Sequence, residues 1–115
     1  NHTLWPINVN EDNFAIWKDS VSTLSEFDNV GIKLSGFGER DPLWNKENIK
    51  PFLDFFLEKF STARCMLGSN FPVDKAFSKK NYFDYWNAYN IHISQYSKNE
   101  KDLLFFKNAE KFYNI

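Results

Sequence analysis

The sequence predicts an α/β fold built from parallel strands and covering helices. Helix-like and strand-like segments alternate along its 115 residues, and parallel strands need a helix-sized connection between them. Three polar residues, His2, Ser35 and Asn70, recur about one strand–helix unit apart, each where a strand is expected to end. The 13 Phe, 5 Tyr and 4 Trp provide ample material for a core.

Residues 11–27 carry apolar side chains at spacings of three and four, which predicts an amphipathic helix. A strand is expected at 30–36, where apolar residues alternate with small or polar ones. The stretch GFGERDP, residues 36–42, is rich in turn formers and predicts a loop. Helical spacing returns at 46–60, which predicts a second helix.

The second half continues the alternation. Residues 63–72, ARCMLGSNFP, predict a second strand that ends in a sharp turn, and residues 79–93 predict a helix. Ser97 and Glu100 have capping-box spacing and start a final helix. We expect one face of it to contain Leu104, Phe105, Asn108, Ala109 and Phe112. The opening NHTLWP is interpreted as the end of a further strand, so the chain would hold about three strand–helix units.

Composition excludes several classes of protein. A net charge of −1 argues against nucleic acid as a partner, because affinity for phosphate backbones comes from clustered Lys and Arg. No apolar run approaches the roughly 20 residues that cross a bilayer, so no membrane partner is expected either. The single cysteine, Cys65, forms no internal disulfide, which favours a reducing cytoplasm. No linker interrupts residues 1–115, so we expect one domain without an internal boundary.

The carboxyl ends of parallel strands are where ligands bind in α/β proteins, so the polar residues there are candidates for function. His2 either binds a metal or polarises a carbonyl, or it is a surface histidine. Asn70 either points at a ligand or serves the turn. Asp74 is the nearest carboxylate and could act as a base, although a solvated loop acid is the plainer interpretation.

Two cations lie near the same edge. Lys33 shares a strand face with Ser35 and either meets an anionic partner on the inner wall of a barrel or extends along an exposed sheet face. Arg40 either clamps a substrate carboxylate or pairs with Glu39 or Asp41. The strand-edge residues Lys33, Ser35 and Arg40 are therefore the candidates for substrate binding.

Two further reactive side chains are expected to be structural. His92 falls in a predicted helix with no partner in view, and Cys65 falls in an apolar strand that favours an inert buried thiol. The sequence contains no HxH, HExxH or GxSxG motif and no phosphate-binding glycine loop. The residues by themselves therefore specify a parallel α/β unit with polar groups at one edge.

Four blocks, NHTLWP, NVGIKLSGFG, ARCMLGSNFPVDK and FFKNAEKFY, together resemble the closing third of amidohydrolase-related proteins, the family of sugar lactonases and dicarboxylate lactonases. That family has a (β/α)₈ barrel. The resemblance implies that the chain is the C-terminal portion of such a barrel, with a natural C-terminus and a cut N-terminus. Its partners would then be the missing N-terminal part of the barrel and a small-molecule substrate.

The same resemblance assigns roles to single residues. His2 matches the family histidine that binds metal or the substrate carbonyl, and Lys33 matches the lysine of the KLSG strand. Asn70 stands where many relatives carry the aspartate that activates water. Because an amide is not a base, either Asp74 or a group outside this chain does that work, or the protein lacks hydrolytic activity.

The function that the resemblance implies is hydrolysis of a lactone, ester or amide carbonyl in a small, sugar-derived or carboxylate-bearing substrate. No cofactor is expected in this chain alone, since the HxH pair of the family is absent; one Zn²⁺ or Mn²⁺ could be present in the intact protein, with His2 as a ligand. The chain by itself is expected to be inactive. The alternative is a catalytically incomplete piece or a small α/β binding module.

Overall fold

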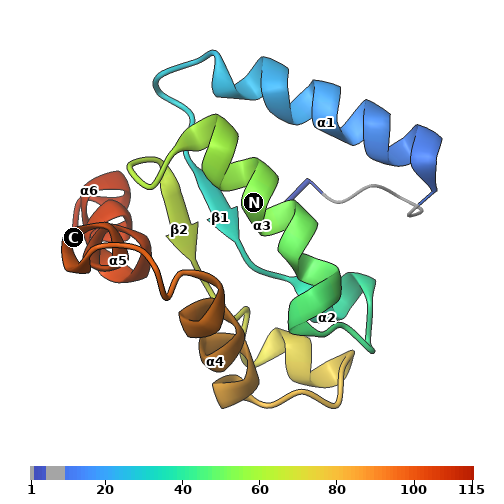
Figure 1. Cartoon of the computed structure of the whole chain (residues 1–115). Coiled ribbons are helices and arrows are strands. Elements are labelled where there is room, and N and C mark those ends of the chain that lie inside the picture. The colour runs from blue at the N-terminus through green and yellow to red at the C-terminus, as the bar shows by residue number, and fades with distance from the viewer. Residues whose placement is uncertain (1, 5–9) are drawn as a thin grey trace.

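The computed structural model describes residues 2–4 and 10–115. Two short strands and a series of helices make up its architecture (Figure 1). In chain order the elements are α1 (Glu11–Ser25), β1 (Ile32–Leu34), α2 (Phe37–Arg40), α3 (Lys46–Phe60), β2 (Cys65–Leu67), the 3₁₀ helix η1 (Val73–Ala76), α4 (Tyr82–His92), α5 (Lys98–Asp102), the π-helix η2 (Leu103–Lys107) and α6 (Asn108–Tyr113).

The sheet in the described part of the chain is one parallel pair. Ile32 lies opposite Cys65 and Leu34 opposite Leu67, and α3 is the connection between the two strands. Both strands point toward α2 and the start of α4, which therefore lie at the carboxyl ends of the strands (Figure 1). The expected α/β fold with parallel strands is confirmed. The further strand end expected at the start lies partly outside the described residues, and His2 itself is in a turn.

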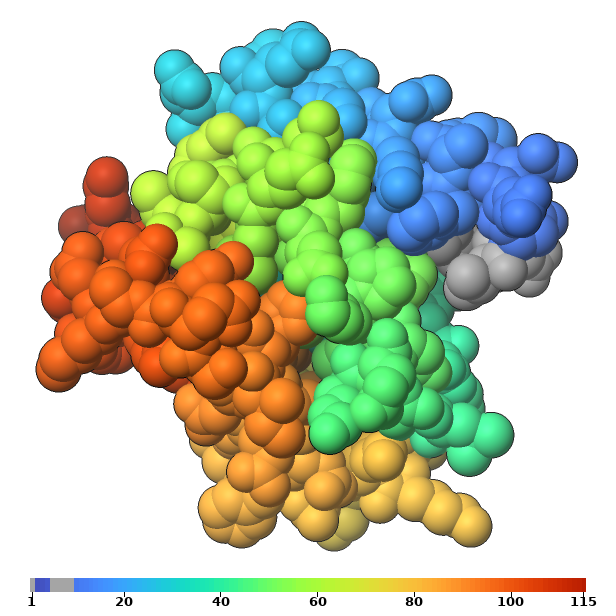
Figure 2. Space-filling view, viewed as in Figure 1, coloured from blue at the N-terminus to red at the C-terminus, as the bar shows by residue number. Residues whose placement is uncertain are grey.

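Helix α3 is the centre of the packing. Asn45 caps it through the amides of Glu47 and Asn48, and its buried stripe of Ile49, Phe52, Leu53, Phe56, Leu57 and Phe60 follows helical spacing. Figure 2 shows α3 between α1 on one side and α4 on the other. The helix expected at 46–60 is confirmed. It could be predicted because capping and apolar spacing are both local properties of the sequence.

An aromatic cluster joins α1 to α3. The Trp17 ring of α1 meets Phe52 at 5.1 Å and Phe56 at 5.0 Å, both edge to face. Its indole Nε1 donates to the Thr3 carbonyl oxygen at 2.9 Å. The segment that carries His2 is therefore tied to the core one residue away from the imidazole.

The segment 36–42 is not a plain loop as the turn residues predicted. Residues Phe37–Arg40 form the short helix α2. Phe37 is fully buried, and Gly36 begins the turn with a φ of 79°, which suits glycine. Burial of the one aromatic ring in this polar stretch requires the chain to turn inward directly after β1.

The C-terminal helix begins as expected. The Glu100 carboxylate accepts from the Ser97 amide and the Ser97 hydroxyl accepts from the Glu100 amide, which completes the capping box. Of the residues expected on one face, Leu104 and Asn108 are buried, and Phe112 lies beside Gly31 but is 55% exposed. The π-helix η2 inserts a wider turn after Asp102 and rotates the residues that follow it.

The described helices include none that is long and apolar enough to cross a membrane.

The end of the chain is held to the sheet by a side chain of α6. The Asn108 Nδ2 atom donates to the carbonyl oxygens of Thr62 at 2.6 Å and Cys65 at 2.7 Å. Both amide hydrogens of Asn108 are therefore used to hold the entry and first residue of β2.

Replacing Asn108 with alanine is expected to lower the free energy of unfolding by about 1–3 kcal/mol, because two backbone carbonyls lose their donor and one of these contacts is buried. Urea denaturation of the wild type and the variant measures this. The matched control is Asn87→Ala on the exposed face of α4, which removes an amide from solvent and should leave the stability unchanged or slightly higher. Equal stability of wild type and Asn108→Ala would contradict the anchoring role.

Candidate active site

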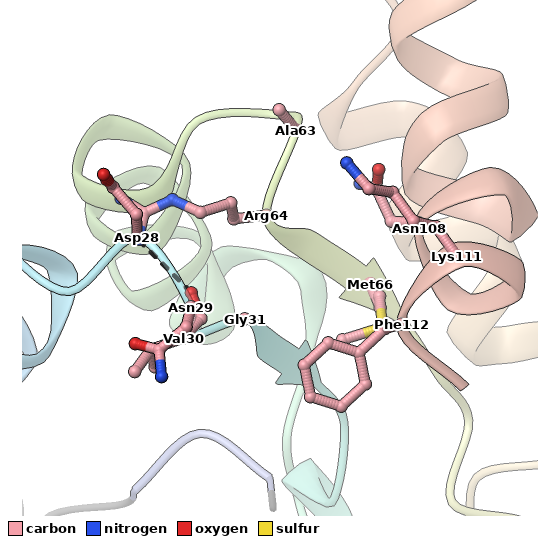
Figure 3. Close-up of a pocket in the computed structure, with 10 residues that line it drawn as sticks. All are labelled: Asp28, Asn29, Val30, Gly31, Ala63, Arg64, Met66, Asn108, Lys111 and Phe112. Atoms are coloured by element: carbon pink, nitrogen blue, oxygen red, sulfur yellow. Dashed lines mark hydrogen bonds between the residues drawn. The ribbon is translucent and has the colours of Figure 1, made fainter. Parts of the chain in front are cut away.

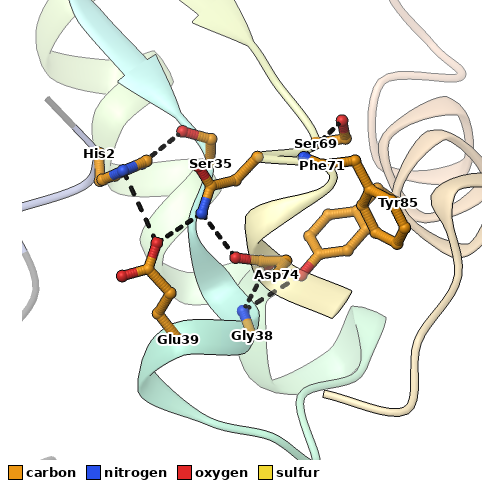
Figure 4. Close-up of polar contacts among 9 residues, drawn as sticks. His2, Ser35, Gly38, Glu39, Ser69, Phe71, Asp74 and Tyr85 are labelled. Carbon is orange, nitrogen blue, oxygen red and sulfur yellow. Dashed lines mark hydrogen bonds and ion pairs between the residues drawn. The ribbon is translucent and has the colours of Figure 1, made fainter. Parts of the chain in front are cut away.

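The segments that follow β1 and β2 converge beside the turn that carries His2 (Figure 4). Ser35 follows β1 directly, and Asn70 comes three residues after the end of β2. A left-handed backbone at Asn70, with φ of 56°, makes the sharp exit from β2 that the sequence predicted. The candidate residues His2, Ser35, Asn70 and Asp74 are thus brought to one edge, as parallel strands require.

His2 is held by Ser35. Its Nδ1 lies 2.8 Å from the Ser35 hydroxyl oxygen, which leaves Nε2 directed toward Glu39 Oε1 at 3.9 Å. A Cβ atom at Gly36 would come within 2.8 Å of Nδ1, so glycine is needed there on steric grounds as well as for its φ. When Ser35 donates to Nδ1, the neutral ring carries its proton on Nε2, where it can donate to a ligand.

Asn70 joins two carboxylates. Its Nδ2 atom donates to Glu39 Oε1 at 2.5 Å and to Asp74 Oδ1 at 2.7 Å. A primary amide carries two hydrogens on nitrogen, and here each one goes to a different acid. The amide therefore acts as a bridge between a residue of α2 and a residue of η1.

Asp74 is fully buried, so the plainer interpretation of a solvated loop acid is wrong. Its Oδ2 accepts from the Gly38 amide at 2.9 Å and from the Tyr85 hydroxyl in a very short contact. Burial raises the pKa of this carboxyl above its ordinary value, while the hydrogen bonds from Asn70 and Gly38 oppose the rise. A Cβ at position 38 would lie 2.7 Å from Oδ2, which explains the glycine.

The two candidate cations differ in placement. Lys33 is half-buried on β1, and its side chain runs past Gly68 of the neighbouring segment. Within residues 2–4 and 10–115 Lys33 has no ion pair with a carboxylate, so the structure supplies no anionic partner for it. Arg40 is exposed at the end of α2, next to Glu39.

The residues expected to be structural lie away from this edge. His92 is not without a partner, because its Nε2 pairs with Asp54 Oδ1 at 3.0 Å between α4 and α3, and burial lowers the pKa of its ring. Cys65 is buried on β2, and burial raises the pKa of its thiol to about 12. A buried thiol with so high a pKa is not a nucleophile at neutral pH.

The donors at the edge do not form a metal site by themselves. Among the described residues no cluster of three or more His, Cys, Asp or Glu side chains could hold an ion. His2 and Glu39 could supply two ligands at most, while Asp74 has both oxygens engaged by protein donors. A metal centre at this edge would need ligands from outside the described residues.

A separate pocket of about 280 Å³ lies at the opposite ends of the strands (Figure 3). Two polar residues that line it, Arg64 and Asn108, already make hydrogen bonds that stabilise the fold. Arg64 donates to the carbonyl oxygens of Ser25, Phe27 and Val30, and Asn108 holds β2 as described above. Phe112 and Met66 supply its apolar wall. The chemistry-bearing groups are therefore gathered at the carboxyl ends of the strands and not in this pocket.

Glu39 and Tyr85 belong to the site although the sequence did not single them out for it. From the sequence, Glu39 is a possible ion-pair partner of Arg40, and Tyr85 falls within the helix predicted at 79–93. A signal for Glu39 was available, because a carboxylate directly after a parallel strand lies at the ligand-binding edge. No local signal pairs Tyr85 with Asp74, since that contact depends on the fold.

Comparison with known proteins points to one family. A family model described as amidohydrolase matches residues 3–115. A curated relative, the uncharacterized protein y4mH of Sinorhizobium fredii, is 36% identical over 115 residues, which cover 100% of this chain and 38% of the relative. The resemblance to amidohydrolase-related proteins stated from the sequence is therefore confirmed.

Solved structures share the fold. An amidohydrolase of Burkholderia multivorans with bound HEPES has a TM-score of 0.83 at 24% identity, covering 98% of this chain and 41% of that one. The structure of the same amidohydrolase with bound Zn has a TM-score of 0.82 at 23% identity, and the match covers 96% of this chain and 40% of that one. A Pseudomonas putida protein provisionally named 2-pyrone-4,6-dicarboxylic acid hydrolase has a TM-score of 0.66 at 20% identity, and the match covers 93% of this chain and 38% of that one. The chain spans about two-fifths of the length of the relatives it matches.

Tyr85→Phe should destabilise the protein by about 1–3 kcal/mol, because the buried Asp74 loses a hydroxyl donor. The loss should depend on pH. The pKa of Asp74 is raised in the folded state above its ordinary value of 3.8. The stability that this carboxyl contributes is therefore fully present below pH 3.8 and is lost as the pH rises through the raised pKa. Tyr85→Phe removes a donor to the ionised form of Asp74 and so makes that loss larger. The difference in the free energy of unfolding between variant and wild type should therefore grow with pH. Urea denaturation from pH 3.5 to 8 measures it, with the exposed Tyr82→Phe as control.

Cys65 should resist thiol reagents in the folded protein. With a pKa of about 12 the thiolate fraction at pH 8 is about 10⁻⁴, and the side chain is closed to solvent. An aromatic disulfide reagent should therefore label Cys65 only after denaturant is added. Labelling of the native protein at the rate of the unfolded chain would contradict this placement.

Proposed function

The chain belongs to the amidohydrolase family, and from that premise we propose that the edge formed by His2, Ser35, Glu39, Asn70 and Asp74 takes part in hydrolysis of a lactone, ester or amide carbonyl. The chain corresponds to about two-fifths of its relatives. We propose that it supplies the last three of eight strand–helix units of one barrel domain, and that activity needs the remaining strands.

One observation carries this proposal. Hydrogen bonds of 2.5–2.8 Å join Ser35 to His2 and join Asn70 to Glu39 and Asp74, and a 3.9 Å approach of His2 to Glu39 links the two groups at the carboxyl ends of the parallel strands. This arrangement places an imidazole, an amide and two carboxyl groups within one small region (Figure 4). Carbonyl hydrolysis needs an electrophile that polarises the carbonyl and a base that takes a proton from water, and this set contains both kinds of group.

The roles follow from the geometry of each group. The His2 Nε2 atom is free of Ser35 and would donate to the carbonyl oxygen, which stabilises the negative charge that develops there. Asn70 would hold the two carboxylates in register rather than exchange protons itself. Lys33 and Arg40 would attract an anionic substrate to the edge, with Ser35 fixing the imidazole.

The substrate class is a small molecule that carries a carboxylate or derives from a sugar. The Pseudomonas putida relative is named for a cyclic ester with two carboxylic acids, which supports a lactone with anionic groups. Two cations near the site, Lys33 and Arg40, fit that charge. The zinc in the Burkholderia multivorans structure supports a divalent ion in the intact protein; His2 would then be this chain's nitrogen ligand through Nε2, and the ion would polarise the carbonyl in place of the imidazole donor. The buried free thiol of Cys65 suits a reducing compartment, for which we propose the cytoplasm.

His2→Ala is expected to lower kcat/KM of the intact protein by about 10²–10³-fold, because the carbonyl oxygen loses its donor. The assay follows acid release from a panel of sugar 1,4-lactones and p-nitrophenolate release from p-nitrophenyl acetate. The matched control is His92→Gln, which alters the other histidine on the α3–α4 side and should leave kcat/KM unchanged. A wild type without turnover on the whole panel, or a His2→Ala variant as active as the wild type, would contradict the proposed function.

A further inference from the structure

The two carboxyl groups of the site have different surroundings, and only one of them is open to water. We propose that Glu39 is the residue that takes the proton from the attacking water, and that Asn70 and Asp74 are positioning residues that hold it in place. This assignment rests on the proposed hydrolase function. It supplies, from the segment after β1, the base that the amide at position 70 cannot provide.

Asp74 is closed on every side. Its Oδ2 accepts from the Gly38 amide and the Tyr85 hydroxyl, its Oδ1 accepts from Asn70, and the residue has no exposed surface. To reach a water, Asp74 would have to give up hydrogen bonds that compensate the burial of a charge. The cost of that loss, together with the lack of access, removes it as the proton acceptor.

Glu39 has the opposite character. Its side chain is 34% exposed, and its Oε1 accepts from Asn70 Nδ2 at 2.5 Å. Within the described part of the chain no donor contacts its Oε2, so that oxygen can accept a hydrogen from water. One oxygen is therefore held by the protein while the other stays available, which is the arrangement a general base needs.

The position of Glu39 also fits the electrophile. Its Oε1 lies 3.9 Å from His2 Nε2, the atom assigned to the carbonyl oxygen. The carboxylate that would hold the water and the nitrogen that would hold the carbonyl oxygen are therefore neighbours. The backbone fixes this placement, because the Gly38 amide, one residue earlier, is bound to Asp74.

The proton balance is complete with these groups and water. The water oxygen forms a bond to the carbonyl carbon as Glu39 takes one of its protons, and the carbonyl π electrons move to the oxygen that faces His2. The tetrahedral intermediate then re-forms the C=O bond and breaks the bond to the leaving oxygen or nitrogen. Glu39 returns its proton to that leaving group, so a lactone yields a hydroxy acid and the enzyme is unchanged.

The direct test is Glu39→Gln in the intact protein, because glutamine can still accept from Asn70 but cannot take a proton. We expect kcat for D-ribono-1,4-lactone or p-nitrophenyl acetate to fall about 10²–10⁴-fold, with KM changed far less. Near-UV circular dichroism should match the wild type. The control is Glu58→Gln at an exposed position of α3, which makes the same chemical change and should leave kcat unaltered.

A second variant separates the two carboxyl groups. Glu39→Ala leaves room for a small acid, so added formate should restore part of the lost activity. Formate should not restore Asp74→Ala, since that carboxyl holds backbone and side-chain donors inside the protein. Rescue of Asp74→Ala but not of Glu39→Ala would reverse the assignment.

The outcomes also separate this assignment from the function on which it rests. A wild type that hydrolyses neither probe overturns the proposed function, and the role of Glu39 falls with it. An active wild type whose Glu39→Gln variant keeps kcat within about threefold overturns the role of Glu39 alone, because loss of a general base costs far more than that.

Discussion

The buried carboxylate of Asp74 is the interaction on which the geometry of the site depends. It accepts from Gly38 after β1, from Asn70 after β2 and from Tyr85 on α4, so the segments after both strands and the helix α4 meet at one carboxyl group. Burial of a carboxylate is costly unless donors surround it, and the donors are in place only when all three segments are. The helix α2 is a consequence of this arrangement, because the Gly38 amide can reach Asp74 only if the chain turns inward directly after β1. Glu39 follows Gly38 within α2, so the same turn places its carboxylate beside His2 and Asn70.

Local sequence signals predicted the elements whose stability is local. The helix α3 matched its expected bounds because an Asn45 cap and a regular apolar stripe lie within one segment, and the capping box at Ser97 was visible for the same reason. Elements that depend on distant contacts were missed. The segment of α2 is polar apart from Phe37, so its helix could not be inferred without its contact to Asp74, 36 residues along the chain. The π-helix η2 was missed as well, because it leaves no mark on apolar spacing.

The candidate site divides in the same way. His2, Ser35 and Asn70 were found because each follows a strand, and the fold brings the ends of parallel strands together. The surroundings of each side chain could not be found, because burial and hydrogen bonding are set by residues that are distant in the sequence. Asp74 is four residues after Asn70 in a polar stretch, which is the usual position of a solvated acid, yet Tyr85 closes it off from water. The sequence therefore located the site but did not distinguish its buried acid from its open one.

The amide at position 70 is best understood from its two neighbours. Each hydrogen of the Asn70 Nδ2 atom satisfies a different carboxylate, Glu39 on one side and Asp74 on the other. An aspartate there would replace two donors with two acceptors between the carboxyl groups of Glu39 and Asp74. Burial is the main cause of the raised pKa of Asp74 and the nearby Glu39 adds to it, so a further carboxylate at position 70 would favour the protonated form of these acids still more. In the proposed assignment Glu39 takes the proton at the end of one strand, and Asn70, at the end of the next, holds Glu39 in place.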